Sequence, residues 1–544
     1  MVHLDEVINR HFKVLVFAVL VLALTMRLLS IEKYPVSLSM DEVAIGYNAY
    51  SILNTGKDEF RESFPLAFRS AGDYKPPVNI YLAVPSIYLF GLTEFAVRLP
   101  VALIGSLTAV ILIFFLSSLG LSKAGSLFGG FWLSVLPWHI HFSRGSFEAI
   151  TALFFLLLGS WLFILWTKSK KALILAGSVA SFSLSVWAYH AERLFTPLVA
   201  LFLFFLFKDR IELAKIKIKK QFLVAGIVLA IFATPFLKLT FFTEAISQRA
   251  ASTSILREAS LGNALHLGSY ENLGERIFDN DFYLIFIHWL GKYLNYYDLR
   301  FWFWKGLAFT PPGYPDLGLL LAVDLPLFFL GVYALIKSKN EKLKGLALFW
   351  FFVGPLPASL TMNEQHPLRA LVWIPFFAIV LGHGFDYLTK KVKSWVVFLY
   401  LAVLAINFVY FADIYIHHFP RYYSEYWQYG YKEVATYACE NRDKYDNIVI
   451  TDTFGGYGPL NTGLPYLYVL FYCDWDREIF LKTGGHSEKI LFRRPNFEDF
   501  LKPEKMLLIG SPWDFLDELE KKGKDVYRLD YPNGKGAFIF KENR

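Results

Sequence analysis

The sequence of 544 residues has few charged side chains: 19% of its residues are Asp, Glu, Lys or Arg, whereas 55% are hydrophobic and 18% aromatic. Soluble domains usually carry about 25% charged residues. Together with a mean hydropathy of +0.39, this composition excludes an ordinary soluble protein and predicts a membrane protein. The sequence also lacks a glycine-rich nucleotide-binding loop, an internal repeat and a low-complexity tract. Nothing therefore indicates a soluble nucleotide as substrate.

Cysteine is almost absent as well. The two cysteines, Cys439 and Cys473, both lie in the polar C-terminal segment. The sequence has no CxxC motif, which excludes a metal or redox centre of that type. The two cysteines can form one disulfide if this segment faces an oxidising compartment, and the sequence alone does not decide whether they are bridged.

The basic residues give a formal net charge of +7, but they occur in short clusters between apolar runs. This pattern predicts no nucleic-acid partner, because nucleic-acid-binding proteins gather their basic residues on one surface. Loops rich in Lys and Arg stay on the cytoplasmic side during membrane insertion, so the clusters mark the inner ends of membrane spans. They lie at residues 10–13, 123, 168–171, 208–220, 337–344 and 390–393.

Between these clusters we predict about eleven spanning helices, since roughly twenty apolar residues cross a bilayer. The first apolar run is longer than the core of a signal peptide and has no Ala-x-Ala cleavage site after it, so we expect it to be retained. The run 78–90 is too short to span and predicts an interfacial or re-entrant helix. The predicted spans lie near residues 14–31, 99–118, 122–138, 146–166, 171–188, 194–207, 221–240, 316–336, 345–361, 370–388 and 395–412.

The predicted architecture is a polytopic α-helical protein of the plasma or cytoplasmic membrane. Residues 1–412 form the transmembrane module, with outer loops 32–98 and 241–315, and residues 413–544 form a small soluble α/β domain outside the membrane. In this domain we expect a helix over residues 431–440. Strands are expected at residues 447–451, 506–510, 526–529 and 537–540.

This topology brings the polar side chains of the outer loops to one membrane face. Asp41 and Glu42 begin an amphipathic helix after the first span, and Lys75 precedes a Pro-Pro pair that starts the short apolar helix. Each has a plain explanation, either an acidic residue at a helix N-terminus or a lysine that reaches lipid phosphate. Their convergence on one face favours a functional site. The other members are Asp73, Tyr74, Arg144, Glu148, His190, Arg193, His366 and Arg369.

Carboxylates among Lys, Arg and His at a lipid interface suit chemistry on an anionic substrate carried by a lipid. The cations would hold a phosphate while a carboxylate takes a proton. Asp41 and Glu148 could also share a divalent cation through their oxygen atoms, although the sequence requires no metal.

The order of these motifs resembles the GT-C superfamily of glycosyltransferases, in the branch that contains protein O-mannosyltransferases and the lipid A aminoarabinose transferase. Members carry an acidic motif in the first outer loop, like Asp41-Glu42, then a Lys-Pro-Pro motif, like Lys75-Pro76-Pro77, and a carboxylate in the next outer loop, where Glu148 stands. The resemblance implies a GT-C fold and transfer of a sugar, such as mannose, from a polyprenyl or dolichyl phosphate. It also implies inversion, and an acceptor hydroxyl on the outer face.

The resemblance assigns Asp41 as the general base and Lys75 as a ligand of the donor phosphate. The chain departs from the family in carrying Glu148 where many relatives have aspartate, and an α/β tail in place of a β-trefoil module. The sugar, the length of the carrier and the acceptor (a protein, an N-linked glycan, a lipid or a polymer) stay open. The remaining expected roles are catalytic for Glu42 and Glu148, phosphate-binding for Arg144, Arg193 and Arg369, and substrate-binding for Asp73, Tyr74, His190 and His366.

A second hypothesis is a transporter or flippase of lipid-linked glycans, because its amphipathic cavity would carry similar residues. Transporters place such groups near the bilayer midplane, so the predicted gathering at one face argues against this hypothesis.

Overall fold

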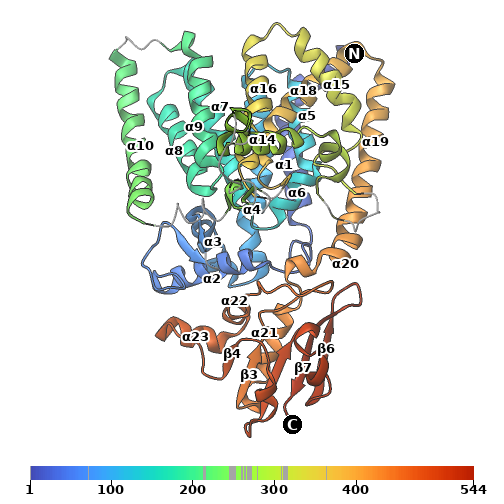
Figure 1. Ribbon diagram of the computed structural model, residues 1–544. Helices are drawn as coiled ribbons and strands as arrows, with labels where there is room; N and C mark the ends of the chain where they lie inside the picture. The colour runs from blue at the N-terminus through green and yellow to red at the C-terminus, as the bar shows by residue number, and fades with distance from the viewer. Residues whose placement is uncertain are drawn as a thin grey trace.

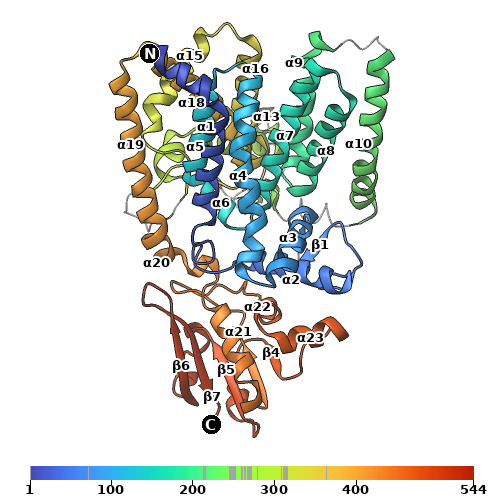
Figure 2. The same ribbon diagram turned by 180° about the vertical axis from the view of Figure 1, so that it is seen from behind.

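The computed structural model describes residues 2–544 except 71–72, 212–215, 244–252, 259–260, 263–264, 266–272, 279, 308, 310–315 and 363. The described chain forms a bundle of helices with a mixed α/β domain at one end (Figure 1). The N-terminus lies at the opposite end of the bundle (Figures 1 and 2). The turn between α15 and α16, which carries one predicted cytoplasmic lysine cluster, lies at that opposite end too.

Six of the described helices are long and apolar enough to cross a membrane. The chain is therefore an integral membrane protein, as its composition predicted. The six helices are α1 (Val2–Leu28), α4 (Glu94–Ser118), α7 (Glu148–Ser169), α10 (Ile216–Phe242), α18 (Ile374–Lys391) and α19 (Ser394–Asp413).

The other five predicted spans also contain a helix, but each helix has 17 residues or fewer, so the count of about eleven spans is not confirmed. Pro137 explains one break, because proline lacks the N–H that would continue the preceding helix. The short helices are α5 (Lys123–Val135), continued after this break by α6 (Pro137–Arg144), α8 (Ala172–Ala188), α9 (Glu192–Leu206), α15 (Asp324–Lys337) and α16 (Glu341–Val353).

Close packing of small residues holds the centre of the bundle together. α4 packs against α1, α5 and α7, and α18 packs against α15 and α5. A Cβ atom on Gly331 of α15 would lie 2.1 Å from the Val380 carbonyl oxygen of α18, so only glycine fits this crossing. Such close approach drives helix association where lipid removes the hydrophobic effect between helices.

A layer of shorter elements lies between the bundle and the C-terminal domain (Figure 2). It contains α2 (Met40–Thr55), the hairpin of β1 (Phe68–Ser70) and β2 (Asp73–Lys75), and α3 (Pro77–Phe90). α3 is the short apolar helix predicted from residues 78–90, and it packs against α2, α4 and α8. Further short helices are α13 (Leu273–Phe278), α14 (Asp281–Asn295), α17 (Leu356–Ser359) and α20 (Phe419–Tyr423). Part of the predicted outer loop 241–315 lies outside the described residues.

The C-terminal domain is built on a five-stranded sheet in the order β4-β3-β5-β7-β6. β3 pairs in parallel with β4 and β5, whereas β7 pairs antiparallel with β5 and β6. The four strands and the helix predicted here are present, and β4 was missed because it has only three residues. The elements are α21 (Tyr431–Glu440), β3 (Asn447–Ile450), α22 (Pro465–Tyr472), α23 (Asp474–Thr483), β4 (Ile490–Phe492), β5 (Met506–Gly510), β6 (Lys524–Asp530) and β7 (Gly536–Glu542).

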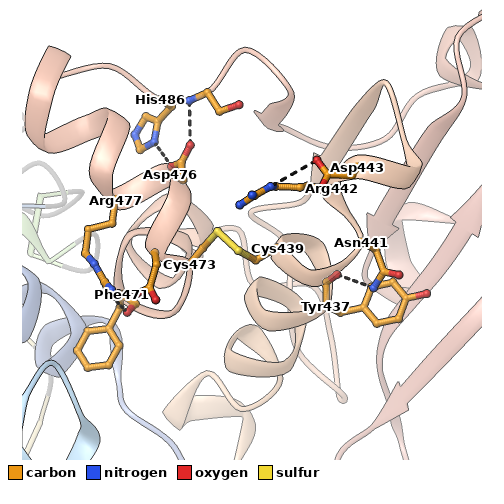
Figure 3. The surroundings of a disulfide bond; sticks show 12 residues. Tyr437, Cys439, Asn441, Arg442, Asp443, Phe471, Cys473, Asp476, Arg477 and His486 are labelled. Carbon is orange, nitrogen blue, oxygen red and sulfur yellow. Dashed lines mark hydrogen bonds and ion pairs between the residues drawn. A yellow bond between two sulfur atoms is a disulfide. The ribbon is translucent and has the colours of Figure 1, made fainter.

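The two cysteines of the chain form a disulfide (Figure 3). Cys439 lies near the end of α21, and Cys473 lies between α22 and α23. The two cysteines are 34 positions apart in the sequence. The disulfide therefore ties α21 to the helical pair that contacts α2.

Candidate active site

A cavity of about 770 Å³ lies where α2 and β2, the ends of the bundle helices and the linker into the C-terminal domain meet. This volume is in the range of small-molecule sites. Its walls come from segments far apart in the sequence, including α2, α6, α7 and the linker that precedes α21. Seven residues predicted from the sequence line it: Asp41, Tyr74, Lys75, Glu148, His190, His366 and Arg369.

Asp41 and Lys75 face each other in this cavity. Asp41 is the second residue of α2, and Lys75 ends β2 directly before Pro76 and the start of α3. The Lys75 ammonium forms an ion pair with Asp41 Oδ1. The lysine side chain is 13% exposed and the aspartate side chain 51%, so the carboxylate is the more accessible partner.

Glu42 lies next to Asp41 in the sequence but does not line the cavity. It closes a capping box with Ser39, whose N–H donates to Glu42 Oε2 at 2.9 Å. Arg98 Nε of α4 donates to Oε1 at 2.7 Å, and the Trp427 indole donates to Oε2 at 3.2 Å. Both Glu42 and Arg98 are almost fully buried. We therefore assign Glu42 to holding three segments together and leave it out of the proposed catalytic set.

Arg144 likewise does not line the cavity. Its guanidinium donates to the carbonyl oxygen of Met26 in the last turn of α1 at 2.9 Å, and to those of Leu29 at 2.9 Å and Tyr34 at 3.0 Å in the segment that follows. A cation is favourable there because the last carbonyls of a helix lack partners and carry partial negative charge. Arg144 and Glu148 are four positions apart but do not lie on one helix, because α6 ends at Arg144 and α7 begins at Glu148.

Arg193 lines a second cavity of about 340 Å³. The two cavities share the residues Tyr189, His190, Thr253 and Arg369, so they adjoin. Arg369 Nη1 is held by Thr361 Oγ1 at 2.6 Å and the Met362 carbonyl oxygen at 3.1 Å. Arg193 thus lines the smaller cavity, and Arg369 lines both.

Histidines complete the wall of the larger cavity. His190 Nε2 lies 3.1 Å from the carbonyl oxygen of Tyr74. Burial, with the nearby charge of Arg369, lowers the pKa of His366 to about 4. Burial and the charge of Arg144 lower the pKa of His141 to about 3. His366 and His141 are therefore neutral at pH 7 and do not add to the positive charge of the site.

Sequence reasoning missed several cavity residues. His141 and Tyr189 lie close in sequence to the predicted site residues Arg144 and His190, but were not themselves predicted. Trp427 had no sequence signal, because it belongs to the segment expected to form a separate domain. The side chain of Asp73, predicted to bind substrate, lies outside the described part of the chain.

Among the described residues, no cluster of three or more His, Cys, Asp or Glu side chains has the arrangement of a metal site. Asp41 and Glu148 both line the cavity, and a divalent cation shared between them stays a prediction.

Glu59 follows α2 and is buried beside the site. The residue is 4% exposed, and burial raises the pKa of its carboxyl from 4.5 to about 8. The folded protein thus holds a proton that the unfolded chain has released above pH 4.5. The contribution of this group to stability is fully present below about pH 4.5, falls as the pH rises to about 8, and is then constant.

We expect Glu59→Gln to abolish the loss of stability between pH 4.5 and 8, because the amide is neutral at every pH. At pH 8 the thermal unfolding midpoint in detergent should exceed that of the unmodified protein by a few degrees, whereas the two should agree near pH 4.5. Glu62→Gln, at an exposed position of the same loop, is the control and should change neither value. A constant difference between Glu59→Gln and the unmodified protein over this pH range would contradict the assignment.

The arrangement of the helices is the fold of known membrane glycosyltransferases. The crystal structure of ArnT from Cupriavidus metallidurans in the apo state has a TM-score of 0.51 at 14% identity and covers 98% of both chains. The apo oligosaccharyltransferase of Archaeoglobus fulgidus has a TM-score of 0.50 at 13% identity, over 97% of this chain and 74% of that one. A third solved structure is the archaeal oligosaccharyltransferase AglB from Archaeoglobus fulgidus in complex with an inhibitory peptide and a dolichol-phosphate. The match to the present protein covers 59% of the length of that AglB chain.

Part of the amino-acid sequence also matches a known protein family. The family described as dolichyl-phosphate-mannose-protein mannosyltransferase matches residues 74–237, a range that includes Lys75, Glu148 and Arg193. A comparison with curated proteins finds no match. The chain thus shares the fold of these enzymes, and residues 74–237 match this mannosyltransferase family, in agreement with the resemblance that its motifs suggest.

Proposed function

We propose that this protein is an inverting glycosyltransferase that moves a sugar from a polyprenyl or dolichyl phosphate to an acceptor hydroxyl. The observation that carries the proposal is the larger cavity, in which Asp41 and Glu148 lie with Lys75 and Arg369. A carboxylate can accept the acceptor proton, and the cations can stabilise the phosphate as it leaves. The family match to a mannosyltransferase favours transfer over the flippase hypothesis.

The reaction follows from these positions. The acceptor oxygen attacks the anomeric carbon from the face opposite the phosphate, and its proton passes to Asp41. The bond between the anomeric carbon and the phosphate oxygen breaks, and the lipid phosphate takes the electron pair. Lys75, Arg369 and Arg193 balance the negative charge of this leaving group.

The ion pair between Lys75 and Asp41 couples donor binding to base activation in this proposal. Without donor, Asp41 neutralises the lysine charge. A bound phosphate competes for the same ammonium, which leaves the Asp41 carboxylate to accept a proton from the acceptor. Lys75 would thereby pair with Asp41 before the donor binds and with the donor phosphate afterwards.

We place the site on the outer face of the membrane. The disulfide between Cys439 and Cys473 supports this side, because disulfides persist in oxidising compartments. The domain that carries the disulfide contributes Trp427 to the cavity wall, so the domain and the site share one side.

The test is an assay of purified protein in proteoliposomes with a polyprenyl-phosphate sugar. A new glycosidic bond on a hydroxyl acceptor, detected by mass spectrometry with release of polyprenyl phosphate, is the expected result. Movement of the intact lipid-linked sugar across the bilayer without bond formation would support the flippase instead. Loss of one sugar from a specific glycan in a deletion strain would identify the acceptor.

Lys75→Ala should raise the KM for the donor about 10-fold to 100-fold, because one charge-assisted hydrogen bond to phosphate is worth about 1.5–3 kcal/mol. The thermal unfolding midpoint should change little, since its partner Asp41 is half exposed. Lys33→Ala removes the same charge from an exposed position of the same outer loop and serves as control. An unchanged donor KM in Lys75→Ala would refute the phosphate contact.

A further inference from the structure

The linker from α20 into the C-terminal domain contains a strained residue beside the active site. Gln428 has φ 50° and ψ 37°, in the left-handed region that residues other than glycine rarely adopt. It is 5% exposed, and the preceding residue, Trp427, lines the catalytic cavity. Strain of this kind persists where the surrounding structure fixes the residue, and it occurs often at functional sites.

The Gln428 side chain contacts the start of α2. Its Oε1 atom accepts a hydrogen bond from the Met40 N–H at 2.6 Å. The Tyr468 hydroxyl of α22 lies 3.1 Å from the same Oε1 atom and 2.9 Å from the carbonyl oxygen of Leu38. Asp41 follows Met40 directly, so these contacts hold the backbone that carries the proposed base.

The C-terminal domain is docked tightly around these contacts. Phe471 of α22 approaches Gly46 of α2 so closely that a Cβ there would lie 2.7 Å from its ring. Lys432 Nζ and the Tyr472 hydroxyl both donate to Glu94 of α4, at 2.8 and 2.9 Å. The disulfide ties α21, which follows Gln428, to α22, which carries Tyr468 (Figure 3).

We infer that Gln428 and Tyr468 are positioning residues for Asp41, so that the C-terminal domain is an integral part of the catalytic site. The inference rests on the proposed function of Asp41. The first N–H groups of a helix lack partners within the helix, and Gln428 supplies one to Met40. Holding this peptide holds the Asp41 carboxylate within reach of Lys75 and the acceptor. A misplacement of about 1 Å can cost a catalyst about 100-fold in rate.

The decisive variant is Gln428→Gly. Glycine adopts the left-handed conformation freely, so this change relieves strain while it removes the acceptor for the Met40 N–H. We expect kcat to fall at least tenfold, with the donor KM unchanged and the thermal unfolding midpoint retained. Amide hydrogen exchange of the peptide that spans residues 39–43 should become faster.

Lys432→Met is the matched control. It breaks the ion pair with Glu94 at the same interface, at a side chain that is 45% exposed. It should leave both kcat and the exchange of residues 39–43 within twofold of the unmodified protein. Tyr468→Phe removes one hydroxyl only and should lower kcat to a smaller extent, which keeps the test valid if Gln428→Gly lowers the unfolding midpoint.

An unchanged exchange rate at residues 39–43 in Gln428→Gly overturns the inference, as does unchanged kcat. An equal loss of kcat in Lys432→Met also overturns it, because domain docking in general would then be responsible. Failure of the unmodified protein to transfer sugar would contradict the proposed function instead. The exchange measurement would still report whether Gln428 orders the start of α2.

Discussion

Asp41→Asn is expected to lower kcat about a thousandfold, while the donor KM stays within a fewfold of its original value. The amide has the size of the carboxylate but cannot accept the acceptor proton, and a general base typically contributes about 10²–10⁴ in rate. This loss corresponds to about 4 kcal/mol in the activation free energy. Lys75 remains in place to hold the donor phosphate, so donor binding survives. Steady-state kinetics with varied donor and saturating acceptor separate the two effects.

Glu62→Gln is the control for this experiment, because it neutralises an exposed carboxylate of the same outer loop. It should keep full activity. Turnover in Asp41→Asn at the original rate would show that Asp41 is not the general base. Glu148, which also lines the cavity, would then be the next candidate.

Glu42→Ala is expected to destabilise the fold by about 3–5 kcal/mol, because it leaves the Arg98 guanidinium buried without its carboxylate partner. The variant also loses the capping box at the start of α2. The measurement is the thermal and chemical unfolding of the protein in detergent. Activity should fall in proportion to the folded fraction.

The comparison with Lys432→Ala tests whether burial is the cause. The Lys432 side chain is 45% exposed, so the loss of its ion pair with Glu94 should cost about 1 kcal/mol or less. If Glu42→Ala kept its stability but lost kcat, the catalytic role expected from the sequence would hold and the structural assignment would be wrong.

The elements predicted from sequence periodicity are largely present. Every predicted span contains a helix, and the four strands predicted from strand-like segments between turn residues are the four longer strands of the C-terminal sheet. The number of spans was less predictable, because an apolar run such as residues 316–336 does not reveal that its helix begins only at Asp324. Local pattern marks where a helix can form, whereas packing against neighbours decides where it begins and ends.

The candidate site was predictable to the extent that topology alone brings residues together. Lysine clusters oriented the spans, and this orientation placed Asp41, Lys75, Glu148 and Arg369 on one face, where the structure gathers them in one cavity. Gln428 and Trp427 were not predictable. Their contacts with α2 join positions more than 380 residues apart, and no local spacing encodes such a contact.

The amino-acid sequence was enough to predict the membrane class of the protein, the position of its polar loops on one face and the acidic pair at the start of α2. The two members of that pair are distinguished by the folded structure. Consecutive residues of an α-helix point about 100° apart, so Asp41 and Glu42 cannot share one environment. Arg98 of α4 and Trp427 of the C-terminal domain bind Glu42 on one side of the helix. Asp41 is thereby left facing Lys75 and the cavity, because the neighbours that the fold supplies determine which carboxylate becomes buried and which stays accessible.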